Sequence, residues 1–99
     1  MDTAIGASAL TALNNNAADY NTAVGGNAGA SITSGSQNTG CGFNALGGTD
    51  DGTNNVAVGV NTLDANCVSN NTAVGHSALG AFTGSNATAV GSGAADAAT

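Results

Sequence analysis

The stretch Asn71-Thr-Ala-Val-Gly-His-Ser-Ala-Leu79 decides the fold, because its opening phrase of five residues recurs along the whole chain. Six copies begin near residues 2, 21, 38, 55, 71 and 87. Their closing glycines step by 19, 17, 17, 16 and 16 residues, and these turn glycines are Gly6, Gly25, Gly42, Gly59, Gly75 and Gly91. Six copies in register cover residues 1–99, so the sequence predicts a single repeat domain.

A second phrase follows each glycine, as in Ser77-Ala-Leu79, and completes the repeating unit. The unit is too short for helix-pair repeats, which need about 33 residues or more. Thr-Ala-Val favours a short strand, and Gly and Asn supply the positive φ angles of turns. The sequence therefore predicts an all-β solenoid, a parallel β-roll of about six coils of 16–19 residues. Each coil is expected to hold two short strands, stacked about 4.8 Å from those of the next coil.

Equivalent positions of successive coils form columns. The apolar columns are the predicted core: Ile5, Val24, Cys41, Val58, Val74 and Val90 in one, and Leu10, Leu46, Leu63 and Leu79 in the other. A Thr ladder comprises Thr3, Thr22, Thr39, Thr72 and Thr88, and a column of Asn is expected to hydrogen-bond along the axis. The position after each turn glycine has no shared chemistry, which predicts that it faces solvent.

Composition narrows the classes of partner. The chain has no Lys or Arg, and its six acidic residues are all Asp, so it cannot neutralise the phosphates of a nucleic acid or an anionic membrane. It has no apolar run long enough to span a bilayer. Large aliphatic residues and Phe number only 16 of 99, so the core is thin and oligomerisation is the expected source of further stability.

Catalytic and metal chemistry have no support in the sequence, and neither an enzyme nor a cofactor is expected. His76 is the only His, with no partner for metal or base chemistry. The stretch 50–54 lacks the spacing and closing Glu of a calcium loop, which favours a turn. Cys41 and Cys67 read best as two small buried hydrophobic residues, with a disulfide between neighbouring coils as the alternative.

Two stretches carry a resemblance to known families. Ser85-Asn-Ala-Thr-Ala-Val-Gly-Ser-Gly-Ala94 resembles the head repeats of trimeric autotransporter adhesins, and residues 71–79 also resemble repeats of phage tail fibres. The resemblance covers nearly all of the chain. It implies a left-handed parallel β-roll, three chains packed about a common axis, a fibre or adhesive role, and a place outside the cell or on a cell or virion surface.

Three functions compete at this point. The first is a structural module of an extracellular fibre, whose partners are copies of itself in a homotrimer or, because neither end shows a polar cap, in an end-to-end polymer. A host surface receptor is a further candidate partner. The second is an ice-binding solenoid that uses the Thr ladder, but strand alternation puts Thr and Val on one face, so a buried Val column would carry Thr inward. The third, an enzyme on a β-helix, lacks the clustered ionisable residues it needs.

Overall fold

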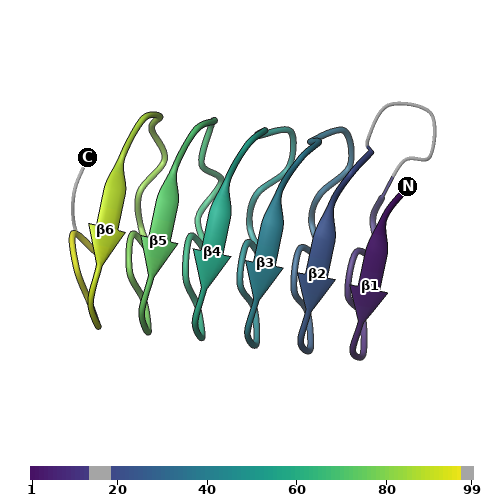
Figure 1. Ribbon diagram of the computed structural model, residues 1–99, viewed down its shortest axis with the longest axis horizontal. Coiled ribbons are helices and arrows are strands. Elements are labelled where there is room, and N and C mark those ends of the chain that lie inside the picture. Colours follow the sequence, from purple (N-terminus) through teal and green to yellow (C-terminus); the bar gives the residue numbers. More distant parts are fainter. Residues whose placement is uncertain (14–18, 97–99) are drawn as a thin grey trace.

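The chain folds into one parallel β-sheet of six short strands (Figure 1); the computed structural model describes residues 1–13 and 19–96. The strands are β1 (Thr3–Ile5), β2 (Thr22–Val24), β3 (Thr39–Cys41), β4 (Val56–Val58), β5 (Thr72–Val74) and β6 (Thr88–Val90). They lie side by side in sequence order, and neighbouring strands pair without a register shift, so that Thr3 lies beside Thr22 and Ile5 beside Val24. No helix occurs in the described ranges. The protein is an all-β solenoid with five full turns from β1 to β6, as the repeats predicted.

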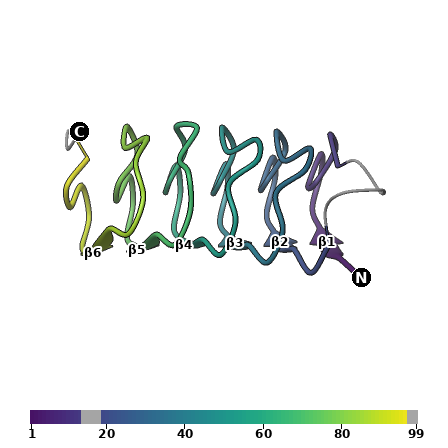
Figure 2. The same ribbon diagram turned by 90° about the horizontal axis from the view of Figure 1, so that it is seen from above.

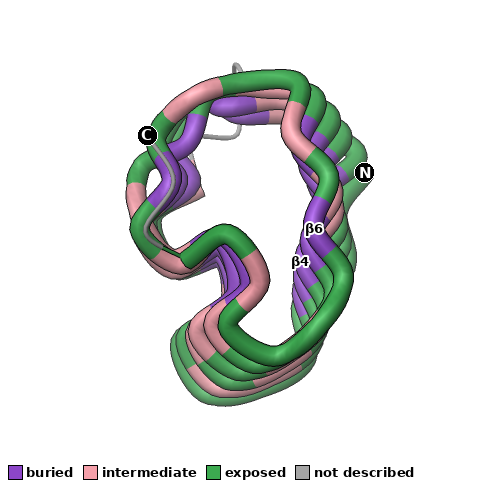
Figure 3. Tube along the Cα trace, turned by 90° about the vertical axis from the view of Figure 1, so that its left-hand side faces the viewer, coloured by how far each residue is buried: buried purple, intermediate pink, exposed green. Residues whose placement is uncertain are grey.

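The coil winds in the left-handed sense. In Figure 1 the strands run downward on the near side, and the chain returns behind them and moves one strand to the left. The view along the axis shows that the coils superimpose, and that the wall opposite the strands bends inward (Figure 3). Seen from above, the coils stand in a row along the longest dimension of 32 Å (Figure 2).

Each coil contains one strand, and the expected second strand is absent from the described residues. The second phrase turns instead of extending: in the fourth coil, Asn61 and Leu63 have φ angles of 56° and 48°. Left-handed residues at alternate positions cannot form a strand. They fold this segment into the inward bend seen in Figure 3.

The turn glycines have the role that the sequence predicted. Gly59 has a φ of 131°, and a Cβ atom there would lie 2.7 Å from the carbonyl oxygen of Gly75 in the next coil. Glycine is therefore required both by the backbone conformation and by the close approach of successive coils. The same two constraints apply at Gly6, Gly25, Gly42 and Gly75.

The core consists of small residues from the sheet and Leu from the opposite wall. Ala57 and Ala73, the central residues of β4 and β5, are completely buried. The predicted Leu column is buried too, with members Leu10, Leu46, Leu63 and Leu79. An added Cβ atom at Gly40, the central residue of β3, would lie 3.1 Å from Leu46 Cδ1. The Leu side chains thus reach the strands and fill the space between the two walls.

The second predicted core column is wrong, because its side chains point outward. The exposed residues are Ile5, Val24, Cys41, Val58, Val74 and Val90. Side chains alternate along a strand, so Thr and Val lie on the face opposite Ala. The facing wall bends inward and carries Leu side chains, so the interior has room for no more than a methyl group at the centre of each strand. Ala fits this space, whereas the larger β-branched residues do not and lie outside.

Other apolar side chains complete the interior beyond the Leu column. Ile32, Cys67 and Phe82 are buried in their coils. Leu13 is partly exposed and packs against the buried cluster around β2 that includes Ile32. The buried apolar residues form two clusters, one around β2 and one spanning the third to sixth coils. Gly29 replaces Leu and Gly40 replaces Ala between them, so the apolar core is thinnest between β2 and β3.

A ladder of buried Asn side chains runs beside the sheet, as the sequence predicted; its members are Asn21, Asn38, Asn55 and Asn71. The amide nitrogen and Nδ2 of Asn38 both donate to Asn21 Oδ1 at 3.1 Å, and Nδ2 also donates to the Gly52 carbonyl at 2.8 Å. At the first coil the Asp2 carboxylate takes the acceptor role, and at the last coil Ala87 donates only its backbone N–H to Asn71.

Candidate interaction surface

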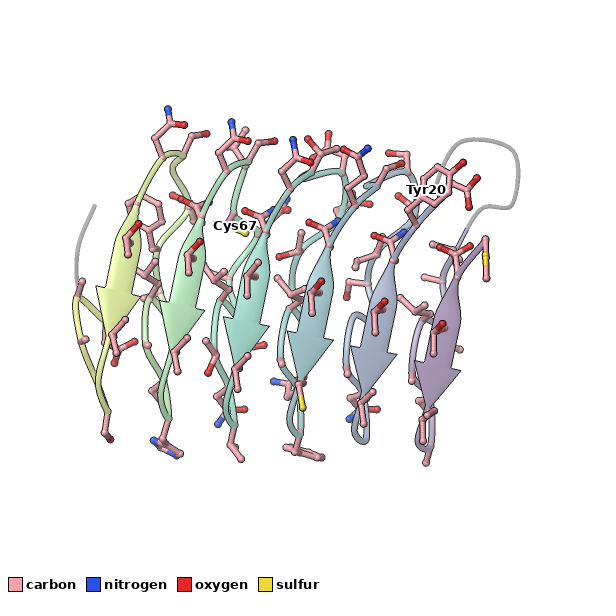
Figure 4. The ribbon with its side chains drawn as sticks, in the orientation of Figure 1. Tyr20 and Cys67 are labelled. Atoms are coloured by element: carbon pink, nitrogen blue, oxygen red, sulfur yellow. The ribbon has the colours of Figure 1, made fainter. Side chains whose placement is uncertain are left out.

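The outward side of the sheet is a regular array of β-branched side chains, seen face-on in Figure 4. We call it the strand face; it comprises Thr3, Ile5, Thr22, Val24, Thr39, Cys41, Val56, Val58, Thr72, Val74, Thr88 and Val90. In-register pairing repeats the array every ~4.8 Å across strands, and the two outward residues of one strand are ~6.6 Å apart. The Thr ladder and the Ile/Val column therefore form two parallel rows on one surface.

The apolar row of the strand face is left exposed by the residues that the structure describes. Val58 and Val74 are 39% and 36% exposed, and Ile5 and Val90 at the two ends are 60% and 71% exposed. This surface was not predicted from the sequence, because the Ile/Val row was expected in the core. The signal that could have identified it is the invariably small residue between Thr and Val, which fits a narrow interior better than Val does.

The strand face carries no charge. All six Asp lie outside the strands. Asp2 accepts from Asn21, Asp50 accepts from the Thr33 hydroxyl, and Asp64 Oδ1 accepts from Asn44 Nδ2 at 2.7 Å. Asp19 pairs with the N-terminal amine. A face without charge, and with apolar atoms in every strand, suits contact with another uncharged surface.

One edge of the strand face continues into the residues that follow the turn glycines. This turn row comprises Ala7, Gly26, Phe43, Val60, His76 and Ser92. Phe43 and Val60 are adjacent in the stack and are 54% and 40% exposed. The Phe43 ring lies over the previous coil, since an added Cβ at Gly26 would lie 3.3 Å from its Cδ2. His76 is exposed, as the variability of this position predicted.

The opposite edge is polar. The amide row comprises Tyr20, Gln37, Asn54, Asn70 and Asn86, all exposed and all with φ between 59° and 62°. Asn54 Nδ2 donates to Asn70 Oδ1 at 3.3 Å. Tyr20, labelled in Figure 4, is the one aromatic member of this row. Side-chain amides are common in left-handed turns, so the conformation explains most of the row.

The two Cys residues have different environments and are not bonded to each other. Cys67 is buried, as predicted, and its Sγ lies 3.2 Å from Thr49 Oγ1 (Figure 4). Burial raises the pKa of the Cys67 thiol above its usual value, although hydrogen bonds from Thr49 and Asn71 oppose this. Cys41 is exposed on the strand face, so the prediction that it is buried is wrong. It occupies the Ile/Val column, which faces outward.

Within the described ranges, the structure contains no pocket and no group of three His, Cys, Asp or Glu side chains placed to hold a metal. Asp50, in the stretch examined for calcium binding, has its carboxylate occupied by the Thr33 hydroxyl. No described helix could cross a membrane.

Comparisons of this chain with protein-family models, with curated proteins and with solved structures give no match.

Proposed function

We propose that this solenoid is a structural module of an extracellular fibre, with no catalytic role, in which three copies pack their strand faces about a common axis. The observation that carries the proposal is the exposed Ile/Val row, which presents apolar side chains in all six coils except the third, where Cys41 stands. A row of this kind on one side of a thin solenoid is typical of an interface. Burying it would add the hydrophobic stabilisation that the small core lacks.

The distribution of charge permits another copy of the chain as the partner at the strand face, although the net charge opposes contact elsewhere. Each copy has a formal net charge of −6 and no Lys or Arg, so two copies repel wherever their Asp residues face each other. The strand face carries no Asp. Contact through this face keeps the carboxylates out of the interface.

The remaining support comes from composition and from the repeats. A chain without Lys or Arg offers no cleavage site to trypsin-like proteases, which suits a fibre outside the cell or on a virion. The repeats resemble those of trimeric adhesin heads and phage tail fibres. Receptor contact, where the fibre makes any, would fall to exposed positions away from the shared axis.

The test is the solution mass of the purified chain, measured by light scattering after size exclusion. The expected result is a discrete species of three times the chain mass of 9.2 kDa. Val58→Asp, on the strand face, is expected to give a folded monomer. Val68→Asp is the matched control, because Val68 is an exposed Val of the same repeat outside the strand. A wild-type monomer at every concentration would overturn the proposal.

A second candidate, ice binding, is favoured by one specific observation: the Thr ladder faces outward beside the Val row. The objection that Thr must share a buried face with Val no longer holds, because the Ala and Leu columns make the core without either. A flat, uncharged grid of hydroxyl and methyl groups can order water. Partitioning of a monomer into growing ice, lost in Thr72→Asp, would support this candidate; exclusion of the protein from ice would eliminate it.

A further inference from the structure

The strand face is narrow. Its strands have three residues each, so six of them spaced ~4.8 Å apart form a strip about 24 Å by 10 Å. If copies of the chain associate as proposed above, side chains at the borders of this strip lie within reach of the partner. The contact therefore extends beyond the strands onto at least one of the two edges.

The two edges differ in what they offer to such a contact. The amide row carries side-chain amides at four of its five positions, and these would need hydrogen-bond partners once buried. The turn row carries Phe43 and Val60 side by side in the third and fourth coils, near the middle of the six-coil stack. Neither has a polar side-chain atom to satisfy. The polar side chains of the turn row are His76 and Ser92, in the last two coils, whereas every member of the amide row has a polar side chain. Burial of the turn row is therefore the less costly extension.

We propose that Phe43 and Val60 anchor the association of copies, and that the interface extends from the strand face over the turn row and leaves the amide row in solvent. The inference rests on the proposed function and specifies which edge of the same surface is used. The Phe43 ring is already held against the previous coil by the space at Gly26, so it loses little freedom on binding. Central, pre-positioned aromatic side chains are the residues that most often dominate interface energetics.

The experiment compares dissociation on dilution for the wild type, Phe43→Ser, Val60→Ser and Tyr20→Ser. Tyr20 is the matched control, because it is an exposed aromatic residue on the amide row. We expect Phe43→Ser to raise the concentration at half-dissociation by at least about 30-fold, because the loss of a hot spot of about 2 kcal/mol weakens one contact by that factor and a trimer has three such contacts. Val60→Ser should raise it by about tenfold, and Tyr20→Ser by less than about threefold. Far-UV circular dichroism checks the fold, and Phe43→Leu should restore most of the association.

Failure of the proposed function and failure of the Phe43 and Val60 anchor give different results. A wild type that is monomeric throughout would overturn the proposed function and the anchor together. A wild-type trimer that persists unchanged in both Phe43→Ser and Val60→Ser would overturn the anchor alone. Weakening by Tyr20→Ser, with Phe43→Ser unaffected, would overturn it too and would place the contact on the amide row.

Discussion

Asn55 Nδ2 donates to Asn38 Oδ1 at 3.1 Å, so a buried amide in one coil is satisfied by the identical side chain of the coil before it. The same nitrogen donates to the Val68 carbonyl at 3.1 Å, and Asn55 Oδ1 accepts from the Asn71 N–H at 3.0 Å. Both donors and the acceptor of a fully buried side chain are therefore used. Such a ladder fixes the register of successive coils, because a displaced coil would leave these groups unpaired in the interior.

Asn55→Asp should destabilise the fold severely, although it changes the size of the side chain very little. The carboxylate would lose both donors and face the oxygens of Asn38 and Val68, and an uncompensated buried charge costs about 3–5 kcal/mol. Burial raises the carboxyl pKa in the folded state, so the folded protein binds more protons than the unfolded chain. Stability relative to wild type should therefore fall as pH rises above about 4. Urea unfolding at pH 4 and pH 7 measures both effects.

Asn54→Asp is the control for this prediction, since it makes the same change one residue earlier. Asn54 is exposed, and Asp tolerates its left-handed φ of 59°. Only the 3.3 Å bond to Asn70 is lost, so we expect a change within about 0.5 kcal/mol. Equal destabilisation by the two substitutions would contradict the assigned role of the ladder.

The periodic features were predictable from the sequence because each is set locally. A glycine that closes every phrase predicts a positive φ, and Gly59 has one. An Asn that opens four of the phrases predicts the ladder that contains Asn38 and Asn55. Leu63, alone among small and polar neighbours, was expected in the core and is completely buried.

The orientation of the strands was not predictable from the same pattern. Alternation establishes that Thr72 and Val74 share a face opposite Ala73, but not which face is inside. The greater hydrophobicity of Val favours Val inside, whereas the narrow space between the two walls of the coil favours Ala. The width of that space depends on the inward bend, which is made by left-handed residues such as Leu79. A Leu with a φ of 51° is not expected from the backbone preferences of Leu. That conformation also replaced the predicted second strand.

Gly59→Ala should be far more destabilising than Gly91→Ala, although the two glycines have nearly the same φ, 131° and 130°. Both substitutions therefore incur the same penalty for placing Ala in a backbone conformation with positive φ. A Cβ at Gly59 would lie 2.7 Å from the Gly75 carbonyl oxygen, whereas at Gly91 the nearest atom would lie at 3.8 Å. We expect an excess of at least about 2 kcal/mol at Gly59, in the range of overpacking a closed interior. Denaturation curves for the two variants give the difference, and similar values would show that inter-coil spacing does not require glycine.

Leu63→Gly should be less destabilising than Leu63→Ala, which reverses the usual order of these substitutions. Both remove a fully buried side chain, at a cost of about 2–5 kcal/mol. Leu63 has a φ of 48°, where Gly is unstrained and Ala is not. The left-handed conformation should make the Ala variant worse by about 1 kcal/mol. Gly29 occupies the equivalent position of the second coil. Thermal unfolding of the two variants gives the order, and a more stable Ala variant would show that the strain of the left-handed backbone is smaller than the gain from burying the Ala methyl group.

The two thiols should report assembly without any label. In dilute solution Cys41 is exposed and should react rapidly with a thiol reagent. As concentration rises and strand faces meet, its rate should fall at least about tenfold, because it lies in the apolar row between Val24 and Val58. Cys67 should stay unreactive until the chain unfolds, because burial raises its thiol pKa and the thiolate is the attacking form. In the variant Cys41→Ser the one remaining thiol is that of Cys67, so its reactivity is measured alone. A Cys41 rate that does not change with concentration would place the interface away from the strand face, whatever mass is measured in solution.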